Sequence, residues 1–157
     1  MEICILSVGK VNSSWIQKGI SEYESRIGKY LKFSSIIIPD IKNAKSLSKE
    51  SIKAEEGKLI LGNVTDSDTL VLMDERGKEF TSREFAEWIQ KNMNSGRKRL
   101  ILCIGGPFGF SEKVYRRADF KLALSSMTFT HEMAKLILSE QVYRGLTILR
   151  GEPYHHD

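Results

Sequence analysis

Short apolar runs typical of strands alternate with amphipathic segments along the whole chain of 157 residues. The strand-like runs are almost continuously apolar, as in LILCI (100–104), and do not alternate apolar with polar side chains. Strands of this kind are buried on both faces, which is typical of a parallel sheet covered by helices. We therefore expect an α/β fold with a mostly parallel sheet, helices on both faces, and a single domain over residues 1–157.

Local signals predict the order of the elements. Strands are expected over residues 2–8, 32–39, 69–74, 99–106 and 120–126, and helices over about 15–30, 49–61, 81–93, 111–117 and 131–149. Thr81 and Glu84 have the spacing of a capping box, and Ser111 is expected to cap the short fourth helix. The polar segment 40–51 is predicted to be a loop, and ERGKEF (75–80) a turn.

A parallel sheet also predicts where a ligand binds. Ligands of such sheets lie at the carboxyl ends of the strands. The loops that follow Asp74, Ile104 and Leu124 are therefore the candidate binding loops.

The second of these loops is rich in glycine. Gly105, Gly106 and Gly109 do not fit the dinucleotide fingerprint, and no Lys-Ser or Lys-Thr pair follows them as in a phosphate-binding loop. The glycines either allow a tight turn from strand to helix or let the backbone touch a flat ligand. The pattern alone slightly favours the tight turn.

Composition and charge constrain the function of the chain less than its motifs do. The net charge of +4 and the isoelectric point near 9.0 permit an RNA partner without requiring one. No run approaches the ~20 apolar residues that span a bilayer, and the N-terminus reads as a strand, so we expect a cytoplasmic protein without a membrane partner. Cys4 and Cys103 lie in apolar runs, which predicts buried thiols, and their spacing fits no metal site.

The last helix, residues 131–149, is apolar around nearly its whole circumference. Such a helix is buried on most sides. Either a partner subunit covers part of it or it is a central core helix, and the pattern favours the two equally.

Three motifs resemble one known family. IGGPFGF (104–110), LSSMTFTHEMAKLILSEQVYRG (124–145) and the terminal PYHHD resemble the ribosomal RNA large subunit methyltransferase H family (RlmH), and SVGK and YESRIGKY also fit. The family belongs to the SPOUT class of S-adenosylmethionine-dependent RNA methyltransferases. The resemblance covers essentially the whole chain. It implies a trefoil knot near the C-terminal end of the sheet, a homodimer, and methyl transfer to N3 of a pseudouridine in large-subunit rRNA of the assembled ribosome.

The resemblance also implies functional residues. It places the S-adenosylmethionine site, without a metal, at Met73, Gly105, Leu124, Ser125, Ser126, Met127, Thr128 and Phe129. It places substrate-side residues at Arg144, Tyr154 and His155, with His155 as the candidate base. Taken alone, terminal histidines are typical of a solvated tail, and Arg144 of a surface charge paired with Glu140. The sequence departs from the family at Thr130, where proline is usual.

Two other functions remain open at this point. One is a non-catalytic RNA- or ribosome-binding protein of the same fold, and the other is a flavodoxin-like domain that binds a different nucleotide. Cofactor-loop and tail motifs occur together, which favours the enzyme. The basic residues 97–99 and 116–117 fit either rRNA phosphate contacts or solvated charge.

Overall fold

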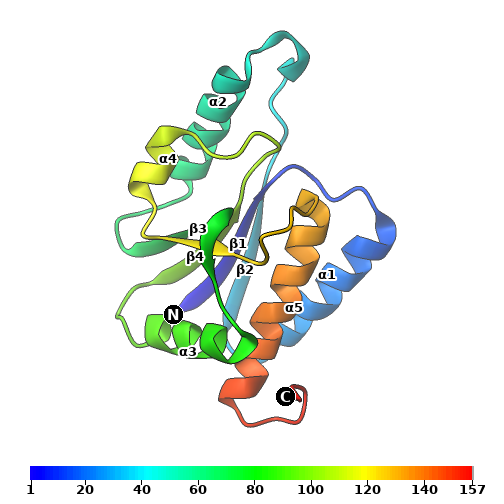
Figure 1. Cartoon of the computed structure of the whole chain (residues 1–157), viewed down its shortest axis with the longest axis vertical. Coiled ribbons are helices and arrows are strands. Elements are labelled where there is room, and N and C mark those ends of the chain that lie inside the picture. The colour runs from blue at the N-terminus through cyan, green and yellow to red at the C-terminus, as the bar shows by residue number, and fades with distance from the viewer. Residues whose placement is uncertain (157) are drawn as a thin grey trace.

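The computed structural model describes residues 1–156 and contains a five-stranded parallel sheet with strand order β2-β1-β4-β3-β5 (Figure 1). The strands are β1 (Glu2–Val8), β2 (Lys32–Ile38), β3 (Asp68–Glu79), β4 (Arg99–Ile104) and β5 (Phe120–Ala123). The helices are α1 (Ser14–Ile27), α2 (Lys49–Gly62), α3 (Ser82–Met93), α4 (Glu112–Arg117) and α5 (His131–Leu149), with a 3-10 turn η1 (Ala44–Ser46). The predicted α/β class and parallel sheet are confirmed.

Helices cover both faces of the sheet, as the continuous apolar strands predict. The first face carries α1, α3 and α5, whose side chains pack on Ile3, Ile5 and Leu102. The second face carries α2 and α4, which pack on Cys4 and Leu6. Each central strand therefore sends alternate side chains into two separate cores.

The predicted turn at 75–80 is wrong, because β3 continues through this segment to Glu79. Its pairing with β5 shifts register between Met73 and Lys78 and then resumes opposite Leu122. Gly77 permits this close approach, since a Cβ atom there would lie 2.6 Å from the backbone nitrogen of Leu122. Pairing with a strand distant in sequence thus overrides a local turn signal.

Other boundaries differ by a few residues. α1 ends at Ile27, β4 at Ile104 and β5 at Ala123, each before its predicted end, and η1 lies inside the expected loop. The capping box of Thr81 and Glu84 and the cap at Ser111 are confirmed.

The core-helix interpretation of the last helix is confirmed on one side of α5, and the partner-subunit interpretation stays a prediction. Leu138, Val142 and Leu146 of α5 are buried in the first core, between α1 and α3. Ile137 and Ile148 lie on the opposite side, are only half-buried, and belong to no core cluster. The trefoil knot and the homodimer that the resemblance implies stay predictions.

Cys4 and Cys103 are buried free thiols, as predicted. Over residues 1–156, no helix is long and apolar enough to span a membrane.

An ion pair closes the end of the sheet where β3 and β4 begin. Arg99 donates to both carboxylate oxygens of Asp68, over 3.0 and 2.6 Å, and Thr65 donates to the same carboxylate from its backbone and its hydroxyl. Asp68 is 1% exposed. Hydrogen bonds from Arg99, then those from Thr65, outweigh desolvation and lower the pKa of Asp68 to about 2.

We predict that Asp68→Asn lowers the free energy of unfolding at pH 7 by about 2 kcal/mol, which is the depression of the pKa converted to energy. The carboxylate stabilises the fold fully above its unfolded pKa, and this contribution is lost as the pH falls from about 4 to 2. Urea unfolding of both proteins across this range measures the gap. A gap that stays constant down to pH 2 contradicts the assignment.

Candidate active site

The three predicted binding loops meet in one cavity of about 1090 Å³ at the carboxyl edge of the sheet. The register explains this arrangement, because Met73 of β3 pairs with both Ile104 of β4 and Leu122 of β5. The loops that leave these strands therefore start side by side. α2 supplies Lys49, Glu50 and Lys53 to the rim, and the first turn of α5 supplies His131 and Ala134.

The glycine turn is a compact hairpin in which the Gly109 amide donates to the Gly106 carbonyl over 3.1 Å. Gly109 has φ +82°, which requires glycine there. The backbone angles of Gly105 and Gly106 lie outside the left-handed region. The lack of room for a side chain, and not the backbone conformation, therefore favours glycine at both positions. At Gly105 a Cβ atom would lie 2.9 Å from the ring of Phe110.

Glu56 of α2 lies directly beneath Gly106. A Cβ atom on Gly106 would lie 2.5 and 2.6 Å from the two carboxylate oxygens of Glu56. Glu56 is 4% exposed, and burial, followed by the nearby charge of Asp40, raises its pKa. The sequence predicted this helix but gave no signal that the Glu56 carboxyl packs against the glycine turn.

A hydrogen-bonded group of three side chains joins β3 to α4 at the edge of the cavity. Tyr115 donates its hydroxyl to Asp74 over 2.6 Å, and Arg76 donates to Asp74 over 3.3 Å and to the Tyr115 hydroxyl over 3.0 Å. Desolvation opposes ionisation of Asp74, but these bonds outweigh it and lower its pKa to about 2. Asp74 therefore stays charged at neutral pH. Sequence reasoning named the loop but missed this group.

The loop from residue 124 to 130 forms the opposite wall. Ser125 accepts a hydrogen bond from the Met127 amide, and the Thr128 hydroxyl donates to Glu75 over 2.8 Å. Thr130 accepts from the Met133 amide and caps α5, so it holds the helix start where the family usually has proline. Met127 is 75% exposed and Phe129 39%, so this wall presents apolar side chains to a ligand.

The cavity brings together seven of the eight expected cofactor residues: Met73, Gly105, Leu124, Ser125, Met127, Thr128 and Phe129. Ser126, the eighth, is exposed and does not line it. Among the described residues, no group of three or more potential metal ligands occurs.

The predicted substrate-side residues form a second cluster. Arg144 donates to Glu140 and lies 4.8 Å from the ring centre of Tyr154, whose hydroxyl donates to Glu140 over 3.1 Å. His155 Nδ1 lies 3.3 Å from an Arg144 nitrogen. The pairing of Arg144 with Glu140 and the contact with the tail are therefore both present. Asp157, the last residue of PYHHD, lies outside the described residues.

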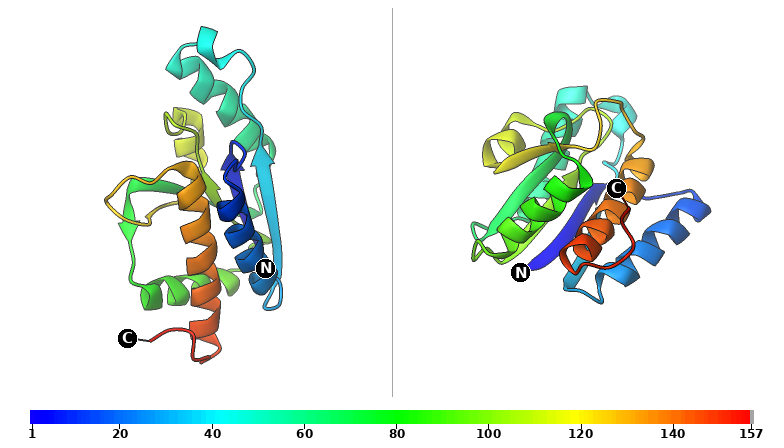
Figure 2. Two further views of the ribbon diagram at one scale, coloured as in Figure 1. Left: turned by 90° about the vertical axis from the view of Figure 1, so that its right-hand side faces the viewer. Right: turned by 60° about the horizontal axis from the view of Figure 1, so that its bottom comes forward.

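The two clusters lie at different levels of α5, the cavity at its first turn and the substrate-side cluster on Glu140 and Arg144 in its second half. The binding loop leads into the first residue of the helix, and the tail folds back at its last turn (Figures 1 and 2). The Tyr154 hydroxyl contacts Glu140, which lies nine residues after His131, or about 14 Å along the helix at ~1.5 Å per residue. The tail of a chain therefore does not reach the cavity of the same chain.

The basic side chains of the two predicted patches differ in whether other groups of the chain already bind them. Arg99 is bound to Asp68, and Arg97 donates to the Asp66 carbonyl, both at the sheet edge opposite the cavity. Arg117 is held by Asp119 and two backbone carbonyls, whereas Arg116 is exposed beside Glu112.

Comparison with known proteins identifies the family. The family model described as "Predicted SPOUT methyltransferase" matches residues 1–155. The chain belongs to the SPOUT methyltransferase family. The resemblance drawn from its motifs is thereby confirmed.

Relatives with curated names match the full length of the chain. It is 51% identical over 156 residues to the ribosomal RNA large subunit methyltransferase H of Christiangramia forsetii, and the match covers 99% of each chain. It is 48% identical over 157 residues to the protein of the same name from Parabacteroides distasonis, covering 100% of both. A probable methylase family protein from Haemophilus influenzae shares the fold, with a TM-score of 0.51 at 16% identity, covering 99% of this chain and 70% of that one.

We predict that Gly106→Ala destabilises the protein by about 1 kcal/mol, because the new methyl group displaces the buried carboxyl at the flexible end of the Glu56 side chain. In a Glu56→Ala background the same substitution costs little, since the clashing atoms are gone. Thermal or urea unfolding of the four proteins measures the coupling.

Gly62→Ala is the matched control, because a Cβ atom there meets nothing within 4 Å. An equal cost of Gly106→Ala in both backgrounds contradicts the contact between Gly106 and Glu56.

Proposed function

We propose that this protein is an S-adenosylmethionine-dependent methyltransferase that methylates N3 of a pseudouridine in large-subunit rRNA of the assembled ribosome. It acts as a cytoplasmic homodimer. One observation carries the proposal: residues from three separate loops, at the positions implied by the family resemblance, line a single cavity. The names of the full-length relatives support the same reaction class.

The lining of the cavity fits S-adenosylmethionine. Apolar side chains of Leu124, Met127 and Phe129 suit a flat adenine, and the open glycine turn exposes backbone groups to it. The cavity is lined by three acidic side chains (Glu50, Asp74 and Glu75) and three basic ones (Lys49, Lys53 and Arg76), and these mixed charges suit a ligand that carries a sulfonium, an ammonium and a carboxylate group. When bound, the cofactor supplies an electrophilic methyl group.

The substrate-side cluster supplies the remaining chemistry. N3 of the base must lose its proton when it gains the methyl group, and His155 is the proposed acceptor of that proton. Negative charge develops on the ring carbonyls beside N3, and the Arg144 guanidinium is proposed to stabilise it. Glu140 and Tyr154 hold the Arg144 side chain in place. The hydrogen bond to Glu140 raises the pKa of Arg144, which keeps it cationic.

A second copy of the chain completes the site. The cavity is lined by the first turn of α5, whereas the tail of the same chain is held against Glu140 and Arg144, so we infer that the tail that covers a cavity belongs to the partner subunit. The half-buried face of α5 carries Ile137, Arg144 and Ile148, which follow one another at helical spacing. If two such helices pack antiparallel about a twofold axis, the second half of one α5 lies beside the first turn of the other.

The runner-up function is a non-catalytic RNA- or ribosome-binding protein. The cluster of Arg144, Tyr154 and His155 favours the enzyme, because simple binding does not require a histidine held beside an arginine. Titration with S-adenosylmethionine distinguishes the two.

We predict that mixed dimers restore activity to two inactive variants. Gly105→Val pushes a branched side chain against the ring of Phe110 and so distorts the cavity that this ring lines, and deletion of residues 154–157 removes the tail, so each homodimer has no complete site. A mixed dimer pairs the intact cavity of the deletion chain with the intact tail of the Gly105→Val chain. Random exchange at equal concentrations should therefore restore about a quarter of the wild-type sites.

Methyl incorporation into large ribosomal subunits measures this result, with native mass spectrometry confirming the mixed dimers. His156→Ala is the control for the tail and should remain active. Mixed dimers without activity, or a fully active deletion homodimer, would overturn the shared site.

A further inference from the structure

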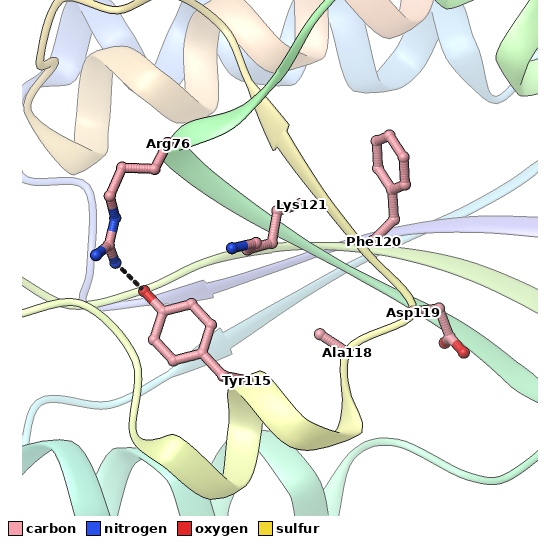
Figure 3. Close-up of a pocket in the computed structure, with 6 residues that line it drawn as sticks. All are labelled: Arg76, Tyr115, Ala118, Asp119, Phe120 and Lys121. Carbon is pink, nitrogen blue, oxygen red and sulfur yellow. Dashed lines mark hydrogen bonds between the residues drawn. The ribbon is translucent and has the colours of Figure 1, made fainter.

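A second hollow of about 580 Å³ lies beside the cofactor cavity, between α4 and β5 (Figure 3). Its lining consists of Arg76, Tyr115, Ala118, Asp119, Phe120 and Lys121. Arg76 and Tyr115 also line the cofactor cavity, so the two spaces share a wall. We call this space the α4–β5 hollow.

Two cations flank one aromatic ring in the hollow. The Arg76 guanidinium and the Lys121 ammonium each lie 5.9 Å from the centre of the Tyr115 ring. Lys121 is exposed and forms no ion pair within residues 1–156. The side chain of Arg76 is 71% exposed, although it contacts Asp74. Both cations are therefore accessible to an anion from solvent.

The carboxylates in and beside the hollow already accept hydrogen bonds from other groups. Asp119 accepts hydrogen bonds from the Leu70 amide over 2.8 Å and from Arg117 over 3.0 Å. Asp74 accepts from Tyr115 and Arg76. Neither carboxylate contacts Lys121, so neither compensates its charge.

The charge of this region is high for the chain. Residues 111–121 contain four cationic and two acidic side chains, a net +2, which is half of the +4 of the whole protein. β5 pairs only with β3, so the hollow lies at the open edge of the sheet. An extended ligand can leave the cofactor cavity across this edge.

We propose that the α4–β5 hollow binds a backbone phosphate of the rRNA strand next to the nucleotide in the cofactor cavity, with Lys121 as its principal contact. The proposal rests on the proposed function. A base in the cavity extends its own backbone toward the shared wall of Arg76 and Tyr115. Accessible cations at that point fit a phosphodiester, which supplies affinity and register without reading sequence.

The test measures binding to large ribosomal subunits as a function of salt. Lys121→Ala should weaken binding several-fold at low salt and reduce the slope of log K against log [salt] by about 1, since one phosphate contact is lost. Lys121→Arg should restore both values. Lys91→Ala, an exposed lysine on α3, is the matched control and should change neither.

Affinity for S-adenosylmethionine, measured by calorimetry, should be the same in wild type and Lys121→Ala, because Lys121 does not line the cofactor cavity. Unchanged ribosome binding by Lys121→Ala overturns the phosphate site but not the enzyme. Weaker binding with an unchanged salt slope also overturns it, and indicates a protein contact. Failure of the proposed function has a different signature, because the wild type itself then neither binds S-adenosylmethionine nor methylates the subunit.

Discussion

The parallel pairing of β3 with β4 and β5 determines where the cofactor cavity of this chain lies. Met73 is opposite both Ile104 and Leu122, so the chain segments that follow β3, β4 and β5 emerge at one edge. The glycine turn, the Asp74–Arg76–Tyr115 group and the loop before α5 all depend on that register. A slip by one residue would turn the buried side chains of a strand to the opposite face and separate the loops.

Much of this arrangement was predictable from the sequence. Continuous apolar runs predicted the parallel sheet and hence the edge where the cavity lies, and the residues of the capping box predicted the start of α3. These features depend on local patterns of side chains. The extension of β3 to Glu79 did not follow, because it depends on pairing with β5, more than 40 positions away. The burial of Glu56 beneath Gly106 was missed for the same reason, since an acidic side chain on a helix is usually solvated.

The position of the tail shows a further limit of the sequence. The family resemblance placed Tyr154 and His155 at the active site, and the structure holds both against Arg144 in the second half of α5. No pattern within one chain reveals that distance. Taken with the half-buried face of α5, it supports the proposal of a site shared between two subunits, which would also explain the apolar circumference of this helix.

The central claim is that this protein methylates a pseudouridine of large-subunit rRNA, and mass spectrometry of that RNA tests it most directly. Ribosomes from cells that lack the protein should contain one pseudouridine without its methyl group. Incubating their large subunits with the purified protein and S-adenosylmethionine should restore a mass increase of one methyl group at that nucleotide. A full set of modified nucleotides in the deletion strain would contradict the account.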